Sequence, residues 1–533
     1  MRGATSGAEP ARAGAGGRPG DGIGDGDGAS DEGVDGDELT ARGVTGTFGG
    51  AMGWSLAMNA GRQAATLLVT FLLARFLGPN AFGIIALATV YIAFVEMLLA
   101  QGMVPAIIHH RRLTAEHLDT CFWLVLASAC ILGALSVAGA GAWAAANDVD
   151  GLRPVIWALT PLLPLRALIV VQEALMRRSL DFKPLALRTN VAVLGGGVTG
   201  VALAFAGAGV WALVGQQLTT YLLDVGILWG ASSWRPRWRF SKDRARELLS
   251  YSVPAAAASV GVFVNRRADA LVLGSFVGAA TLGLYRFAMR LVETLVESAV
   301  GSLGAAGLPE LARHQHDRAR FSDRIVSMVR LTAYSATVLL CGLAAAARPG
   351  LAVLGDRWLP AADGLRVLCI AGVLASLAAL GGPALQALGR TRTLAALSWT
   401  ASALSVSTFA VVGSTLDGRP FDAQVTTLAS ATAILYGVLA ALYLTIVGRS
   451  VGLRLRRLAE LTAVALVGGS TGFALGHVGA MAVAGWAPDL VVATAAASTA
   501  SLTALGVLVG IDPEYRSLLV RAGSRLVPSG AAR

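Results

Sequence analysis

From residue 48 to residue 510 the chain is an almost unbroken series of apolar stretches, most of them about 20 residues or longer. A helix of that length crosses the hydrocarbon core of a bilayer, and lipid admits only helices and closed barrels as spanning structures. Of all residues 14% are charged and 55% are hydrophobic, whereas a soluble domain is about 25% charged. The sequence therefore predicts an all-α polytopic membrane protein.

The apolar stretches predict about fourteen transmembrane helices. We place them at 48–76, 81–104, 118–146, 154–176, 185–207, 209–231, 249–275, 279–307, 325–347, 361–388, 393–414, 423–447, 459–483 and 488–510. Residues 1–46 are rich in Gly and Asp and nearly free of large apolar side chains, so we expect a disordered, acidic cytoplasmic tail. Residues 513–533 are expected to form a C-terminal cytoplasmic tail.

Arginine and lysine are unevenly distributed among the predicted loops. Loops after even-numbered stretches hold twenty-one of them, and loops after odd-numbered stretches hold four. Because cytoplasmic loops carry the excess of Lys and Arg, we expect the even loops and both termini in the cytoplasm, with the chain in a bacterial inner membrane. In the richest segment, 233–248, Trp234 and Trp238 are typical of a membrane interface, which favours a basic linker over a nucleic-acid patch.

One short pattern occurs twice, 200 residues apart. It reads F-L-G-P-N-A-F-G at 76–83 and F-V-G-A-A-T-L-G at 276–283. The coinciding pairs are Phe76/Phe276, Gly78/Gly278 and Gly83/Gly283. Internal repeats are a common plan for transporters that rock one lobe against another. We therefore predict an N-lobe at 47–232, a C-lobe at 249–450 and two extra helices at 451–512, with the four glycines as hinge positions.

Several charged side chains fall inside the predicted spans. A charge at the centre of a span costs roughly 2.5–3.5 kcal/mol, so such residues should face a bundle interior or a hydrated cavity. The candidates are Arg62, Glu96, Arg166, Glu173, Asp224, Arg266, Arg267, Asp269, Arg286, Arg290, Glu293, Glu297 and Arg366. Two of them, Glu173 and Arg286, are expected close enough to the interface for their charged ends to reach it.

Helical spacing groups some of these charges. Arg286, Arg290, Glu293 and Glu297 follow i, i+4, i+7 and i+11 and form one polar stripe. Arg290 with Glu293, and Arg266 with Asp269, are spaced i, i+3, so both pairs are also compatible with purely structural ion pairs within one helix.

The surplus of arginine favours an anionic substrate. We predict that Arg62, Arg266, Arg267 and Arg290 line a cavity and bind a diphosphate, because the planar guanidinium binds phosphate through two hydrogen bonds. Glu96, Asp269 and Glu293 are the candidates for binding a coupling ion. A proton, a sodium ion and no coupling ion all stay compatible with these residues.

Several motifs in order resemble one family. They are L-A-R-F-L-G-P-N-A-F-G at 73–83, E-A-L-M-R-R-S-L-D-F at 173–182, G-V-W-A-L-V at 209–214, R-A-D-A-L-V-L-G-S-F-V-G-A-A-T-L-G-L-Y at 267–285, G-D-R-W at 355–358 and A-L-G-R-T-R at 387–392. Together they resemble the polysaccharide-flippase (Wzx-like) branch of the multidrug/oligosaccharidyl-lipid/polysaccharide exporter superfamily. The resemblance implies two six-helix lobes around a central cavity, and export of polyprenyl-diphosphate-linked oligosaccharide from the inner to the outer leaflet for surface polysaccharide. It also implies a polysaccharide polymerase and glycosyltransferases as possible partners.

Other functions are compatible with fewer of the observations. A cation-coupled drug exporter or a lipid II flippase of the same superfamily is the first alternative, although a drug exporter is expected to have an acid-dominated cavity. A membrane polymerase or ligase needs a sizeable extracytoplasmic loop with catalytic groups, and the longest predicted one, about 348–360, contains no histidine. No G-x-x-x-x-G-K-[ST] pattern occurs, and the four cysteines lack metal-ligand spacing, so we expect no enzyme activity, no cofactor and no metal site.

Overall fold

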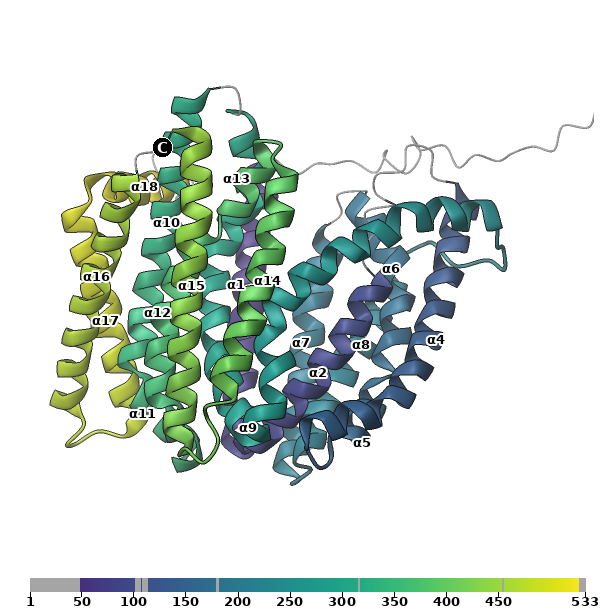
Figure 1. The fold of residues 1–533 in the computed structure, drawn as a ribbon, viewed down its shortest axis with the longest axis horizontal. Coiled ribbons are helices and arrows are strands. Elements are labelled where there is room, and N and C mark those ends of the chain that lie inside the picture. The colour runs from purple at the N-terminus through teal and green to yellow at the C-terminus, as the bar shows by residue number, and fades with distance from the viewer. Residues whose placement is uncertain are drawn as a thin grey trace, which may run out of the picture.

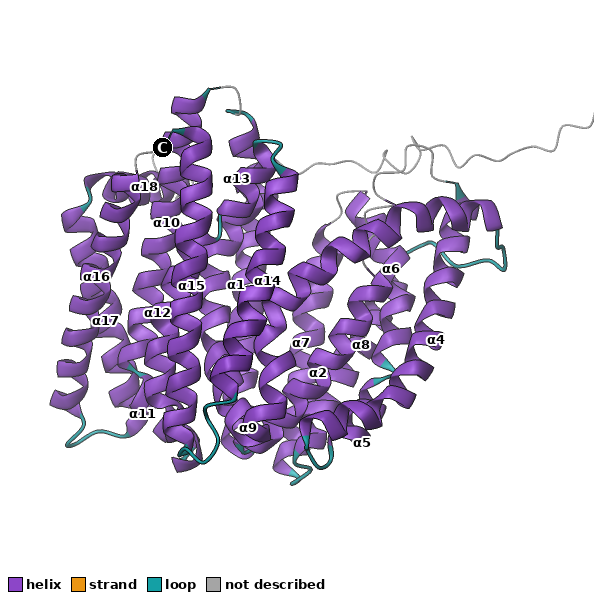
Figure 2. Ribbon diagram, viewed as in Figure 1, coloured by secondary structure: helices purple, strands orange, loops and turns teal. Residues whose placement is uncertain are grey.

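The computed structural model describes residues 48–100, 107, 114–178, 182–314, 317–452 and 455–526. The predicted acidic tail at 1–46 and the loop carrying Arg111 and Arg112 lie outside these residues. Throughout the described part the secondary structure is helical, with no strand (Figure 2). The predicted all-α class is confirmed.

In the described part of the chain, seven helices precede the long central one. They are α1 (Phe48–Phe76), α2 (Pro79–Ala100), α4 (Ala115–Asn147), α5 (Leu152–Leu159), α6 (Leu162–Arg178), α7 (Phe182–Phe205) and α8 (Val210–Ala231). Here "N-lobe" denotes this group. Apart from α1, which extends beside α9, its helices form one side of the molecule (Figure 1).

The longest helix, α9 (Lys242–Ala312), bends once. Its backbone leaves helical geometry at Gly278, so two spans meet there at a kink. The remaining elements are α10 (Arg318–Ala345), α11 (Ala347–Leu354), the 3₁₀ turn η1 (Asp356–Ala361), α12 (Ala362–Ala378), α13 (Gly381–Ala387), α14 (Thr391–Gly413), α15 (Phe421–Val451), α16 (Leu455–Val483), α17 (Asp489–Ile511) and α18 (Pro513–Leu526). Here "C-lobe" denotes α9 to α15.

Eleven helical segments of the described chain are long and apolar enough to cross a membrane. One of them, Ser259–Gly301, is 43 residues long and contains the Gly278 kink, so it can cross twice. The predicted count of fourteen is compatible with these segments. Two of the predicted spans are each built from two helices. In one, α5 and α6 meet at Pro161, and in the other, α12 and α13 meet just before Pro383. Proline interrupts a helix because it supplies no N–H to the preceding turn.

The packing distinguishes the two ends of the bundle. The "basic end" carries the arginine-rich α8–α9 loop (232–241) and α18 (Figure 1). The "seam end" carries the α1–α2 turn, and contacts with this turn and the start of α2 place η1 and the kink of α9 there as well. One buried apolar core runs through both lobes, whereas a separate core at the basic end joins the C-lobe to the helices after it and includes Leu311, Phe321 and Tyr515. The lobes are therefore joined through a shared core that does not extend into the basic end of the C-lobe.

Candidate functional site

The two copies of the repeat contact each other at the seam end. A Cβ added to Gly83 would overlap the backbone carbonyl of Ala279, and a Cβ added to Gly283 would overlap that of Pro79. The two contacts are equivalent in the repeat, because Gly83 corresponds to Gly283 and Ala279 corresponds to Pro79 at the 200-residue offset. We call this crossing of α2 with the second half of α9 the "lobe seam". Any side chain larger than hydrogen at either glycine would push the lobes apart there.

The other two repeat glycines differ from one another. Gly278 has φ 69° and ψ 171°, a conformation that essentially only glycine adopts, and it forms the kink of α9. Gly78 has no positive φ, and a Cβ there would lie 3.8 Å from Nη1 of Arg357, an ordinary contact. Gly78 and Gly278 match in the sequence, but only Gly278 needs to be glycine because of its backbone conformation.

A cluster of charges lies on α9 around Arg286. Its guanidinium donates to Oδ2 of Asp269 at 2.6 Å and lies 3.9 Å from Oε1 of Glu293, and both carboxylates belong to the same helix on either side of the kink. Side chains of Arg286 and Asp269 are only 11% and 8% exposed. Its partners hold Arg286 inside the C-lobe, and its expected place near the membrane interface stays a prediction.

The two ion pairs that helical spacing allowed, Arg266 with Asp269 and Arg290 with Glu293, give way to pairs with Arg286. Asp269 pairs with Arg286 across the kink, and Glu293 pairs with Arg286 on its own side of the kink. The reason is the bend at Gly278, which folds the two halves of α9 so that positions 17 residues apart meet. Arg266 and Arg290 are consequently exposed on the protein surface, while Arg267 is half-buried within the electrostatic field of Arg286.

The polar stripe of α9 faces the other lobe. Nε2 of Gln63 on α1 donates to Oε2 of Glu297 at 2.9 Å, and this bond orients the stripe toward α1. Arg290 lies two turns before Glu297 on the same face. The half-buried Arg62 adjoins Gln63 on α1. The turn of α1 that carries Arg62 therefore lies beside the second half of α9, which carries Arg290.

A second charged network lies inside the N-lobe, and it includes Glu96. The carboxylate of Glu96 on α2 accepts from the hydroxyl of Tyr221 on α8 at 3.1 Å and lies 3.4 Å from Nε of Arg166. Arg166 also donates to Glu173 at 2.9 Å, which lies two helical turns further along α6. Glu96 therefore belongs to a different cluster from the other two predicted coupling residues, Asp269 and Glu293.

Glu173 is the centre of this N-lobe network. Besides Arg166, its carboxylate meets Arg177 at 2.8 Å and Arg188 on α7 at 3.4 Å, and its side chain is 6% exposed. Asp224 on α8 lies 3.8 Å from Nε of Arg188, so α8 joins the network through Asp224 as well as through Tyr221. Three arginines stabilise Glu173 inside the N-lobe, and its expected place near the membrane interface stays a prediction.

Sequence reasoning missed three members of this network, Arg177, Arg188 and Tyr221, and it assigned Arg177 to a loop. The signal for Arg188 was present, since it is an arginine a few positions inside the predicted span 185–207. For Tyr221 there was no signal, because a tyrosine in an apolar helix is ordinary and only the contact with Glu96 gives it a role.

The two clusters differ in charge balance. The N-lobe network pairs three arginines with three acids: Arg166, Arg177 and Arg188 with Glu96, Glu173 and Asp224. The α9 cluster holds three arginines and two acids, because Arg267, Arg286 and Arg290 interact electrostatically with Asp269 and Glu293. Positive charge is therefore in excess in the α9 cluster and not inside the N-lobe, which suits an anion beside α9.

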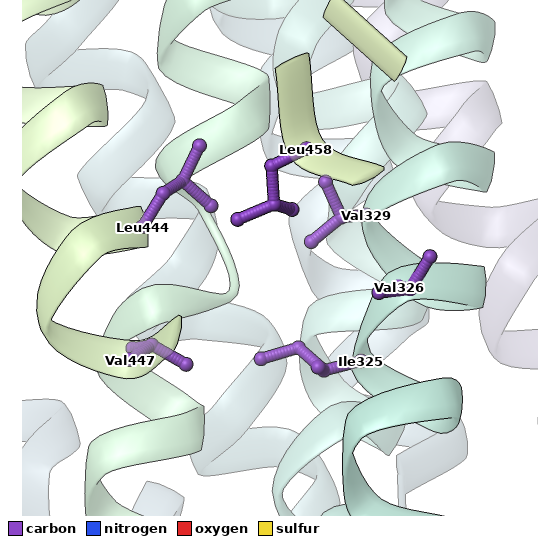
Figure 3. A pocket seen from close by; sticks show the side chains of 6 residues that line it. All are labelled: Ile325, Val326, Val329, Leu444, Val447 and Leu458. Carbon is purple, nitrogen blue, oxygen red and sulfur yellow. The ribbon is translucent and has the colours of Figure 1, made fainter. Parts of the chain in front are cut away.

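A small apolar pocket lies elsewhere, near the basic end of the C-lobe. Side chains from α10, α15 and α16 point into it (Figure 3). They are Ile325, Val326, Val329, Leu444, Val447 and Leu458. The lining has no polar group to bind a headgroup, so this pocket is not a candidate for the diphosphate site.

Comparison with known proteins agrees with this architecture. Residues 72–363 match the family described as "Polysaccharide biosynthesis protein". The chain belongs to this family.

Two curated relatives are informative. The chain is 25% identical over 376 residues to the "Succinoglycan biosynthesis transport protein ExoT" of Rhizobium meliloti (strain 1021), an alignment that covers 70% of this chain and 76% of the relative. It is 23% identical over 357 residues to the "Lipopolysaccharide biosynthesis protein WzxC" of Escherichia coli (strain K12), covering 64% and 70%. The family resemblance inferred from the sequence motifs is confirmed.

Solved structures show the same fold. The "Lipid II flippase MurJ, inward closed conformation" matches with a TM-score of 0.67 at 12% identity, covering 86% of this chain and 98% of that one. An "Inward-facing conformation of a multidrug resistance MATE family transporter of the MOP superfamily" matches with a TM-score of 0.57 at 14% identity, covering 73% and 94%. This family member therefore has the helical fold of the exporter superfamily that the sequence predicted.

Proposed function

We propose that the chain flips polyprenyl-diphosphate-linked oligosaccharide from the cytoplasmic to the outer leaflet of a bacterial inner membrane. The family, the two lobes and the names of relatives such as the succinoglycan transport protein support this proposal. Unassisted flipping is slow, because each unsatisfied polar group of the headgroup costs several kcal/mol in hydrocarbon. A polar boundary between lobes offers the headgroup a path while the polyprenyl tail stays in lipid.

The observation that carries the substrate class is the excess of arginine in the α9 cluster. Arg290 in this cluster and the neighbouring Arg266 are exposed and can reach a ligand, whereas Arg286 is engaged by Asp269 and Glu293. Exposed guanidinium groups can bind a diphosphate through paired hydrogen bonds. Arg62 and Arg267, both half-buried, complete the proposed site from α1 and α9.

The mechanism follows from the two ends of the bundle. The basic end faces the cytoplasm by the positive-inside rule, and the lobes are packed together at the seam end. The headgroup enters from the cytoplasmic side and is bound by the arginines of the proposed site. Rocking of the lobes then opens the seam end and exposes the headgroup to the outside. Asp269 and Glu293 are the coupling candidates in the α9 cluster, and Glu96 would act from within the N-lobe network.

The test depletes the protein in its native host and measures lipid-linked oligosaccharide in each leaflet. We expect a lipid-linked repeat unit to accumulate in the inner leaflet while surface polymer is lost. Unchanged lipid-linked pools with normal surface polymer would reject the proposal in favour of a drug or small-molecule exporter of the same superfamily.

Complementation with variants then tests the site. Arg290→Gln and Arg266→Gln are each expected to reduce the rate of surface-polymer recovery about tenfold, since a charge-assisted hydrogen bond contributes roughly 1.5–3 kcal/mol. The matched control is Arg456→Gln, which removes an exposed arginine on α16 whose partner is Glu460. Equal recovery by all three variants at equal protein levels would exclude Arg266 and Arg290 from the binding site.

A further inference from the structure

The C-terminal turn of α1 is capped by the other lobe. A helix leaves its last four carbonyls without partners inside the helix, and α1 ends at Phe76. The indole N–H of Trp358 donates to the carbonyl of Ala74 at 2.9 Å, and Nη2 of Arg357 donates to the carbonyl of Arg75 at 2.9 Å. Both donors belong to η1 of the C-lobe, so two terminal carbonyls of the first helix are satisfied across the lobe boundary.

The ring of Trp358 is buried among aromatic side chains from both lobes. It is 0% exposed, and its centroid lies 5.3 Å from that of Phe82 on α2 and 4.4 Å from that of Phe287 on α9. Phe287 in turn meets Phe71 of α1 at 6.1 Å. These four rings form one cluster at the seam end, and Trp358 brings to it both apolar area and a directed hydrogen bond.

Local geometry holds Trp358 and Arg357 in this position. Gly355, the first residue of the G-D-R-W motif, has φ 111° and ψ 160°, which turns the chain from α11 into η1 and is a conformation that L side chains rarely adopt. The guanidinium of Arg357 lies over the α1–α2 turn, with Nη1 3.8 Å from the position of a Cβ on Gly78. Positive charge at the C-terminus of α1 also complements the negative end of the helix dipole.

We propose that the G-D-R-W segment at 355–358 is a latch that keeps the seam end closed. Opening of the lobes at that end must break both trans-caps on α1, leave the carbonyls of Ala74 and Arg75 without their partners and pull Trp358 out of the aromatic cluster. The latch rests on the proposed function, because it gives the outward-opening step of that transport cycle a specific structural barrier. It lies beside the Gly83 and Gly283 contacts, so release of the latch and separation of the seam occur together.

The experiment measures how often the seam end opens. A reporter cysteine replaces Leu77, which is 4% exposed in the α1–α2 turn, and Cys130, the exposed native thiol, is replaced by Ser. Cells are treated with a membrane-impermeant maleimide, and the labelling rate of the reporter is followed. The rate is proportional to the population in which the seam is open when that population is a minority.

Two variants test the latch and one variant controls for the loss of an indole bond. Trp358→Phe keeps a ring and removes the donor, and Arg357→Gln removes the second cap. Trp157→Phe is the matched control, because the indole of Trp157 donates to the carbonyl of Val137 at 3.0 Å within the N-lobe. We expect labelling to rise about three- to tenfold for Trp358→Phe, to rise for Arg357→Gln, and to match the parent for Trp157→Phe.

Equal labelling rates for Trp358→Phe and Trp157→Phe would overturn the latch, whether both match the parent or both exceed it. The readout needs no transported substrate, so it separates the latch from the proposed function. Faster labelling of Trp358→Phe together with unchanged lipid-linked pools on depletion would uphold the latch and reject the proposed substrate.

Discussion

Arg286 and Arg290 are four residues apart on α9 and meet different surroundings. Arg286 is enclosed by Asp269 and Glu293, while Arg290 is exposed on the stripe that faces α1. A buried pair is strongly destabilised when one partner is removed, by about 3–5 kcal/mol, so Arg286 has a structural reason to be an arginine. Only neighbours from the folded chain distinguish such a residue from one that is available to a ligand.

At the residue scale, Gly278 gives a sharp prediction. Gly278→Ala is expected to lower the free energy of unfolding by about 1–3 kcal/mol, because a side chain at φ 69° and ψ 171° is strained. The control is Gly78→Ala, at the equivalent position of the first repeat, where the backbone has no positive φ. Thermal unfolding of both variants in detergent measures the difference. Equal losses at the two positions would contradict the assignment of the kink to Gly278 alone.

At the scale of elements, the extra helices α16 and α17 are held by small residues. A Cβ on Gly476 would lie 2.6 Å from Cβ of Ala500 and 2.9 Å from Cβ of Ala345, so three helices approach closely at one glycine. In lipid there is little hydrophobic drive between helices, and close backbone approach supplies much of the contact energy. The pair is thereby attached to α10, the helix that contains Ala345.

Gly476→Leu is expected to separate α16 from this contact and to destabilise the protein by about 1–3 kcal/mol, the usual cost of overpacking. Gly506→Leu on α17 is the control, since nothing lies within 4 Å of a Cβ there. The melting temperature in detergent distinguishes the two. A loss in the control as large as in Gly476→Leu would mean that the small-residue contact is not what holds the pair.

At the scale of the whole molecule, the repeat places equivalent residues against each other. Gly83 meets the backbone at Ala279, and Gly283 meets it at Pro79, so the seam lies on the pseudo-symmetry axis of the two lobes. Transporters with such repeats move one lobe against the other about a fixed site. A motion of one lobe against the other must therefore change the backbone contacts at the seam.

Gly83→Leu and Gly283→Leu are expected to have the same effect, because each places a side chain into the equivalent contact. Both should open the seam and raise labelling of the Leu77→Cys reporter at least tenfold, as a side chain there overlaps backbone. Gly382→Leu is the control, because a Cβ added at Gly382 would make only an ordinary contact, 3.9 Å from Cδ1 of Leu394. A strong effect at one seam glycine and none at the other would show that the two repeats do not form a symmetric contact.

The sequence by itself determined the class of the protein and most of its helices. Apolar stretches of bilayer length admit few structures in lipid, so composition and spacing were sufficient for the helical fold. The repeat at 76–83 and 276–283 was visible as well, because local patterns survive in the linear chain. Motif order, in the same way, was sufficient to recognise the family that the comparison confirmed.

The tertiary structure decided which charges are paired and which are exposed. Asp269 and Arg286 meet because α9 bends at Gly278, and Glu173 is buried because α6 and α7 bring three arginines to it. Helical periodicity relates residues within about one or two turns and says nothing of partners from other helices. The trans-caps of Trp358 and Arg357 on α1 depend on contact between segments almost 300 positions apart, which no local pattern in the sequence encodes.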